Sequence, residues 1–100
     1  MKQKILPPHI TAEILKAQKN EITEYHIYRK LAASIKDKHN NEVLRKIAND
    51  EKSHHDTWKK YTGRSVRPDR WKIFFFFWIT RLFGLTFGIK LMENGEEAAQ

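Results

Sequence analysis

The sequence predicts an all-α fold, and both composition and residue patterning favour this class. Hydrophobic residues make up 40% of the 100-residue chain, whereas glycine and proline number only 4 and 3. A β-sandwich would need more turn-forming residues. The length fits one small domain with a modest core. The chain has no cysteine, which excludes disulfides and thiolate zinc sites and fits a reducing, cytoplasmic location.

The first two helices are expected at about 11–35 and 42–61. Two prolines precede the first helical pattern, and the polar run 36–41 interrupts it. Gly63 is expected to follow the second helix as its C′ residue. Because the connection is short, the two helices are predicted to pack side by side as an antiparallel hairpin.

Residues 71–100 are expected to add an apolar, aromatic helical segment and the start of a third helix near Leu91. Between residues 73 and 89 only Arg81 is charged. Three alternatives stay open for 71–92: a crossover packed on the bundle or in a dimer interface, a helix lying on a membrane surface, or a membrane-spanning helix. A spanning helix needs about twenty apolar residues, and the central arginine disfavours it.

A basic segment comes directly before this apolar run. The chain carries a net charge of +7, and the stretch 59–72 holds six lysines and arginines against one acid, Asp69. Basic residues collected beside an apolar run fit an anionic lipid surface better than the groove of a nucleic acid, so no nucleic-acid partner is predicted. The candidate membrane or interface residues are Trp71, Phe74, Phe75, Phe76, Phe77 and Trp78.

In the predicted hairpin, each helix presents a row of residues to the other. Both rows are apolar except near their middle. Seven-residue steps along the first helix give Ile14, Glu21, Tyr28 and Ile35. Along the second helix they give Leu44, Glu51 and Trp58, with Ile47, His54 and Tyr61 on the adjoining row. A carboxylate in such a row costs several kcal/mol unless it is paired or bound to a metal. Glu21, Glu51 and His54 are therefore the candidate metal ligands.

Glu51 and His54 form a Glu-x-x-His motif, in which both side chains leave one face of the helix about one turn apart. This spacing lets both reach one ion, or lets the carboxylate bridge two ions. The alternatives are an exposed charge or a core carboxylate paired with a basic residue for Glu21, and a buried or surface Glu–His pair for the other two. The remaining histidines are expected at the surface: His9, His26, His39 and His55.

In this context the sequence resembles the first half of a rubrerythrin. The matching residues are Glu21-Ile-Thr-Glu-Tyr-His-Ile-Tyr28 and, further on, Asp50-Glu51-Lys-Ser-His54. The rubrerythrin-like domains fused to vacuolar-iron-transporter-type membrane domains look most similar, also over 81–93, and the resemblance covers about 12–100. It implies a ferritin-like fold in which Glu21, Glu51 and His54 bind iron and Tyr28 lies close behind them.

The chain departs from that family because it has no second Glu-x-x-His. A di-iron bundle uses two such motifs and two further glutamates. Glu96 is preferred on spacing as the third-helix ligand, ahead of Glu93 and Glu97, and Glu24 is a candidate supporting ligand. The chain is expected to be one incomplete ferritin-like domain, with 11–61 as its metal-binding hairpin.

Dimerisation is the favoured way to complete this half of a four-helix bundle. A two-fold pair of chains supplies the full set of ligands, and the encapsulated ferritins, which are similar in this respect, use such a pair. A homodimer or higher homo-oligomer is therefore expected. The other expectation is a truncated chain with no complete metal site.

The implied function is iron handling by a di-iron centre, with manganese as the other metal that suits these donors. The resemblance implies ferroxidase or peroxidase chemistry and a link to an iron-transporter domain, at the membrane face of the cytoplasm. The absence of cysteine rules out a rubredoxin domain in this sequence. The alternative function is a membrane-associated helical interaction module.

Overall fold

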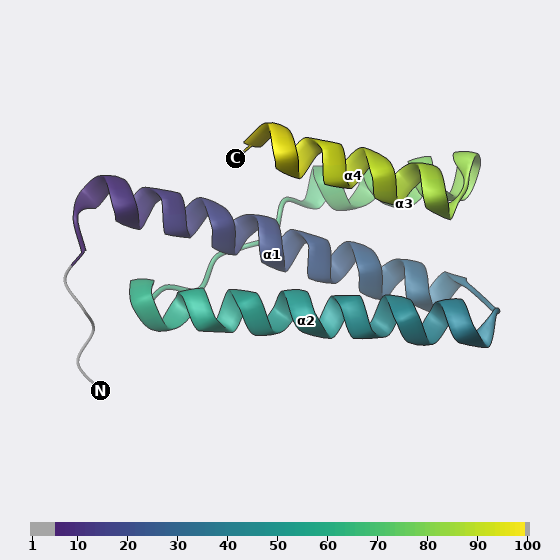
Figure 1. Ribbon diagram of the computed structural model, residues 1–100, viewed down its shortest axis with the longest axis horizontal. Coiled ribbons are helices and arrows are strands. Elements are labelled where there is room, and N and C mark those ends of the chain that lie inside the picture. Colours follow the sequence, from purple (N-terminus) through teal and green to yellow (C-terminus); the bar gives the residue numbers. More distant parts are fainter. Residues whose placement is uncertain (1–5, 100) are drawn as a thin grey trace.

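A computed structural model describes residues 6–99 of the protein, with side chains described through residue 94, and this part of the chain forms four helices and no strand. α1 spans Pro8–Ser34, α2 spans Lys38–Thr62, α3 spans Arg70–Phe83 and α4 spans Leu85–Ala99. Figure 1 shows α1 and α2 as long antiparallel neighbours, with the shorter α3 and α4 on the other side of α1. The prediction of an all-α fold is confirmed.

The turn between α1 and α2 is tighter than the sequence suggested. Asp37 caps α2, because its Oδ1 accepts a hydrogen bond at 2.8 Å from the backbone N–H three residues further on. Asn41 donates from Nδ2 to the carbonyl oxygen of Ala32 at 2.5 Å. This bond gives a hydrogen-bond donor to one of the last carbonyls of α1, which have no partner within the helix. The polar run 36–41, expected as a break, therefore mostly forms the first turn of α2, and only residues 35–37 connect the helices.

Glycines end both α2 and α3. Gly63 follows α2 in the left-handed conformation with φ of 67°, as predicted. Gly84 has φ of 100° and lets the chain reverse directly from α3 into α4. The apolar segment 71–92, expected as one helical segment, is thus divided between two helices. The helix start expected near Leu91 lies earlier, at Leu85.

The linker between α2 and α3 is held against α1 by two buried polar side chains. Gln18 donates from Nε2 to the carbonyl oxygen of Arg64 at 2.8 Å and accepts from the hydroxyl of Thr62 at 2.5 Å. Thr23 accepts a hydrogen bond at 2.9 Å from the backbone N–H of Asp69. These bonds lead the linker along α1, so that α3 begins beside it.

α3 and α4 approach closely because Gly88 has no side chain. A Cβ at this position would overlap Oγ1 of Thr80 on α3 and would lie 3.0 Å from the Cβ of the same threonine. Thr80 is buried, and its hydroxyl has no hydrogen-bond partner within the part of the chain that the structure describes. Of the two glycines in Gly84-x-x-x-Gly88, the first makes the turn and the second makes the helix contact.

One hydrophobic core draws residues from all four helices. Its buried members are Ile27, Tyr28, Leu31 and Ala32 of α1, Leu44 and Ala48 of α2, Phe76 of α3 and Met92 of α4. Among the described residues, α1 contacts α2 and α3, α3 contacts α4, and α2 contacts neither α3 nor α4. The helices therefore form two pairs, α1 with α2 and α3 with α4, which meet through α1 and α3.

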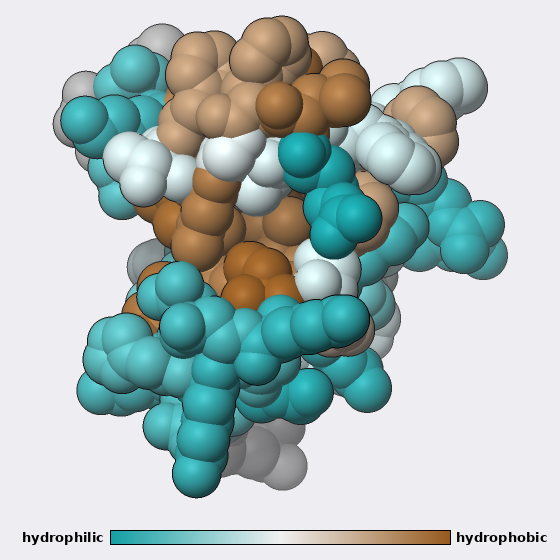
Figure 2. Space-filling view, turned by 90° about the vertical axis from the view of Figure 1, so that its right-hand side faces the viewer, coloured by the Kyte–Doolittle hydropathy of each residue, from teal (hydrophilic) through white to brown (hydrophobic). Residues whose placement is uncertain are grey.

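Large exposed apolar side chains gather on α3 and α4. Figure 2 shows apolar residues covering this pair at the top and lining a hollow beneath it, while the lower part of this face is hydrophilic. Of the six candidate interface residues, Phe76 is buried and Phe77 is half-buried, whereas Trp71, Phe74, Phe75 and Trp78 are exposed. Within residues 6–99, no helix combines the length and the apolar character needed to cross a membrane.

Candidate metal centre

Glu21 on α1 and Glu51 and His54 on α2 converge at one place. Nδ1 of His54 lies 3.2 Å from Oε2 of Glu21 and 3.8 Å from Oε1 of Glu51. One ligand atom from each residue lies within 4.8 Å of the other two. The spacing of three residues along α2 and the register of the antiparallel hairpin together produce this cluster.

The cluster lies at an edge of the hairpin. The side chains of Glu21 and Glu51 are 22% and 18% exposed, whereas that of His54 is 57% exposed. The two helices shield the carboxylates on one side, and the imidazole approaches them from the solvent side. A metal ion here would have protein on one side and water or a second chain on the other.

α2 is rotated relative to the row that seven-residue steps predict. Its buried residues are Leu44, Ala48, His55 and Thr62. The expectation that His55 lies in solvent is wrong, because this residue is only 5% exposed. Ala48, His55 and Thr62 lie seven residues apart, so α1 packs against the row one residue beyond the predicted row of Ile47, His54 and Tyr61. Because neighbouring residues on a helix point about 100° apart, His55 turns toward α1 and His54 lies at the edge of the hairpin.

His55 does not belong to the cluster of three. Its Nδ1 lies 3.1 Å from Oδ1 of Asp56, and its buried Nε2 has no hydrogen-bond partner among the described residues. Lys52 donates to the same carboxylate at 2.8 Å. The bonds from Lys52 and His55 hold the pKa of the Asp56 carboxyl below its ordinary value.

The geometry of the three residues fits a metal ion. Two atoms bound to one ion at about 2.1 Å lie at most about 4.2 Å apart. The distances from His54 to the two carboxylates, 3.2 and 3.8 Å, fall within this limit. Small side-chain rotations would bring the distance between the two carboxylates within it as well. Two carboxylates and one imidazole suit iron or manganese, and three protein ligands leave coordination positions open. Without a metal, a protonated His54 makes an ion pair with the same carboxylates.

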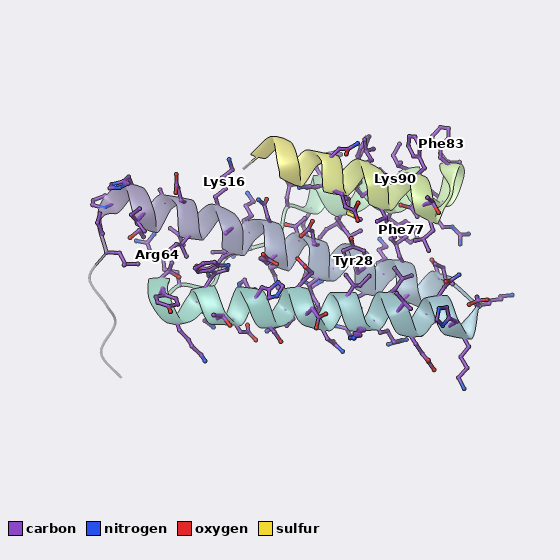
Figure 3. All side chains as sticks on the ribbon, viewed as in Figure 1. Lys16, Tyr28, Arg64, Phe77, Phe83 and Lys90 are labelled. Atoms are coloured by element: carbon purple, nitrogen blue, oxygen red, sulfur yellow. The ribbon has the colours of Figure 1, made fainter. Side chains whose placement is uncertain are left out.

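The other predicted site residues lie outside this cluster. Glu24 is buried, at 3% exposed, but is not among the residues that converge. Tyr28 is buried in the core between α1 and α2 (Figure 3), about 10 Å along the helix from Glu21. The side chain of Glu96 lies outside the described residues.

A second polar group, around His26, was not predicted from the sequence. His26 was expected at the surface. The structure half-buries His26 beside Arg70, because the linker folds the basic segment back over α1. A usable signal was present: His26, Arg29 and Lys30 are spaced i, i+3 and i+4 and so share one face of α1. The fold-back itself depends on Gln18 and Thr23, which carry no such signal.

No protein-family model, curated protein or solved structure matches the chain. A proposal of function therefore rests on the chemistry of the cluster and on the sequence around it.

Proposed function

We propose that this protein is an iron-binding protein of the ferritin-like, rubrerythrin-type class, with Glu21, Glu51 and His54 as its ligands. The observation that carries the proposal is the convergence of two carboxylates and one imidazole from two helices. Oxygen-rich donor sets with a single imidazole suit iron better than structural zinc. The likeness of the sequence around all three residues to rubrerythrins supports iron over manganese.

A second copy of the chain would complete the site. Each chain supplies one glutamate on α1 and one Glu-x-x-His on α2, and a di-iron bundle uses two of each. A two-fold axis beside the exposed edge of the hairpin would bring both sets together. The exposure of His54 at this edge is consistent with such an approach. The proposed state is a homodimer, or a higher homo-oligomer built from it, with one iron per chain.

The reaction proposed is ferroxidase- or peroxidase-type oxidation of iron. Ferrous iron, when bound, supplies the electrons that reduce O₂ or peroxide. Glu21 and Glu51 hold the charge of the ion from two different helices, and each carboxylate can bind through one oxygen or two. His54 supplies the third donor, on the side of the cluster away from α1 and α2.

Replacing Glu51 or His54 by glutamine is expected to weaken metal binding by at least about tenfold. Removing a residue that only hydrogen-bonds to a metal ligand already lowers metal affinity by about that factor, and removing the ligand itself should cost no less. Anaerobic titration with Fe(II), and with Co(II) as an absorbing substitute, measures the affinity. Glu42→Gln and His39→Gln are matched controls, since both residues are exposed on the same helix. The control variants are expected to bind as the wild type does.

The proposal is wrong if the wild type binds no Fe(II), or if Glu51→Gln and His54→Gln bind as tightly as their controls. Sedimentation equilibrium with metal analysis tests the assembly. One ion per chain in a dimer supports a shared site. A monomer that binds iron through all three residues would contradict the dimer and leave the ligand assignment standing.

A further inference from the structure

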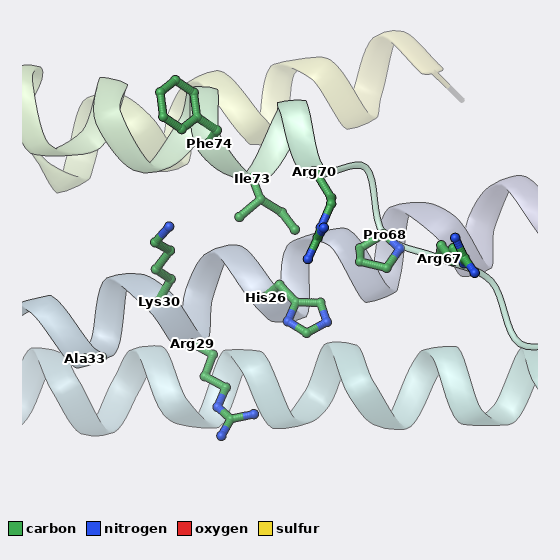
Figure 4. Close-up of a pocket in the computed structure, with 9 residues that line it drawn as sticks. All are labelled: His26, Arg29, Lys30, Ala33, Arg67, Pro68, Arg70, Ile73 and Phe74. Atoms are coloured by element: carbon green, nitrogen blue, oxygen red, sulfur yellow. The ribbon is translucent and has the colours of Figure 1, made fainter.

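An open pocket of about 960 Å³ lies between α1, the linker and the start of α3. Five basic residues line it: His26, Arg29 and Lys30 of α1, Arg67 of the linker and Arg70 of α3. Figure 4 shows Arg70 reaching down from the start of α3 toward His26 on α1. No carboxylate is among the described residues that line this pocket.

The positive charge of the pocket is not balanced by any residue that lines it. Burial, followed by the charges of Arg29 and Arg70, holds the pKa of His26 below its ordinary value. Arg29 donates to the hydroxyl of Tyr25 at 3.0 Å, which is a neutral partner. Lys30 lies 4.7 Å from the ring centre of Phe77, which lies between α3 and α1 (Figure 3). An anion bound in the pocket would supply the negative charge that these side chains lack among the lining residues.

We propose that this pocket binds a phosphate group, held by Arg67 and Arg70 with His26 at its base. The planar fork of a guanidinium matches the oxygens of phosphate with two parallel hydrogen bonds, and two such forks line this pocket, one from the linker and one from α3. The volume accommodates a phosphate together with the group that carries it.

The phosphate could come from a phospholipid headgroup or from a free phosphate compound, and the surroundings favour the lipid. Phe74 lines the pocket, and the exposed aromatic face of α3 continues from it. Trp71 is 82% exposed and Phe75 is 51% exposed. Aromatic side chains beside a cationic pocket are typical of a surface that inserts at the headgroup level of a membrane.

The double variant Arg67→Gln, Arg70→Gln is expected to weaken binding of inorganic phosphate by at least about tenfold, because each charge-assisted hydrogen bond contributes substantially. Titration of isotope-labelled protein followed by NMR measures the affinity and localises the shifts. Lys46→Gln with Lys59→Gln removes the same charge from exposed positions of α2 and is the control. The pocket proposal fails if phosphate does not bind, or if both double variants lose affinity equally.

A second arm distinguishes the two sources. Co-sedimentation with phosphatidylcholine vesicles, with and without phosphatidylglycerol, measures lipid binding. For a headgroup site, Trp71→Ala with Phe75→Ala weakens binding to the anionic vesicles and leaves inorganic phosphate unaffected, whereas Tyr61→Ala with Val43→Ala changes neither. Binding of inorganic phosphate with no binding to either kind of vesicle assigns the pocket to a free compound and overturns the lipid source.

Anion binding is expected to strengthen as the pH falls through the pKa of His26 in the bound state, because a bound anion favours the protonated imidazole. A bound anion raises the lowered pKa of His26, so binding takes up a proton, and each unit of that rise increases the affinity about tenfold at low pH. The other charged groups that line the pocket with His26 are Arg29, Lys30, Arg67 and Arg70.

Sulfate is the probe for this measurement, because its charge is constant over the range. His26→Gln is expected to bind sulfate with an affinity that does not change with pH. A pH dependence that survives in His26→Gln would remove His26 from the site.

Discussion

Replacing Gln18 by methionine is expected to lower the free energy of unfolding by about 3 kcal/mol. Gln18 is fully buried and makes two hydrogen bonds, to the carbonyl of Arg64 and from the hydroxyl of Thr62. Methionine keeps the length and most of the volume of the side chain, so the loss reports on the hydrogen bonds rather than on a cavity. Urea denaturation followed by circular dichroism measures the change.

Lys16→Met is the matched control, because it introduces the same side chain at an exposed position of α1. It is expected to change stability by no more than about 0.5 kcal/mol. Combining Gln18→Met with Thr62→Val tests whether the two residues act together, since both remove the same bond and their effects should then be less than additive. A loss below about 1 kcal/mol for Gln18→Met would show that the linker is held by other contacts.

Replacing Gly88 by alanine is expected to destabilise the protein by about 2 kcal/mol, although alanine is the better helix former by about 1 kcal/mol. The added Cβ overlaps Oγ1 of Thr80 and lies 3.3 Å from its Cα, so rotation of the threonine side chain does not relieve the contact fully. The helices must move apart, which loosens the packing of α4 on α3. Thermal and urea denaturation measure the loss.

Thr80→Ala in the Gly88→Ala background is expected to recover part of the stability, because it removes the oxygen that the new Cβ meets. It also removes a buried hydroxyl that has no hydrogen-bond partner among the described residues. Thr86→Val, at an exposed position of α4, is the control for a substitution that touches no other helix. Strictly additive effects of the changes at positions 80 and 88 would contradict direct contact.

The local elements of this fold were predictable because their signals are local. Gly63 ends α2 in the conformation that only glycine adopts easily, and the motif Glu51-x-x-His54 places two side chains on one face of a helix by geometry alone. The break between the first two helices was misjudged by a few residues. Asp37 can cap a helix or sit in a loop, and its hydrogen bond to the N–H of Asn40 decides between them.

The phase of α2 could not be obtained from the sequence. His54 and His55 are adjacent, and either could face α1 on composition. α1 packs against the row of Ala48, His55 and Thr62, one residue beyond the predicted row, and this choice of row turns His55 inward. The candidate ligand His54 consequently lies at the edge of the hairpin rather than in its centre.

By itself, the sequence determined that this protein is helical, that two helices precede Gly63, and that Glu51 and His54 share one side of α2, because each of these depends on residues within a few turns of one another. Only the tertiary structure decided that the apolar segment forms two helices, with α3 packed on α1 and α4 on α3. It also decided that Arg70 lies beside His26 and that Arg67 lines the same pocket. Those arrangements depend on buried contacts between distant residues, such as Gln18 with Arg64 and Thr80 with Gly88, whose partners no local pattern specifies.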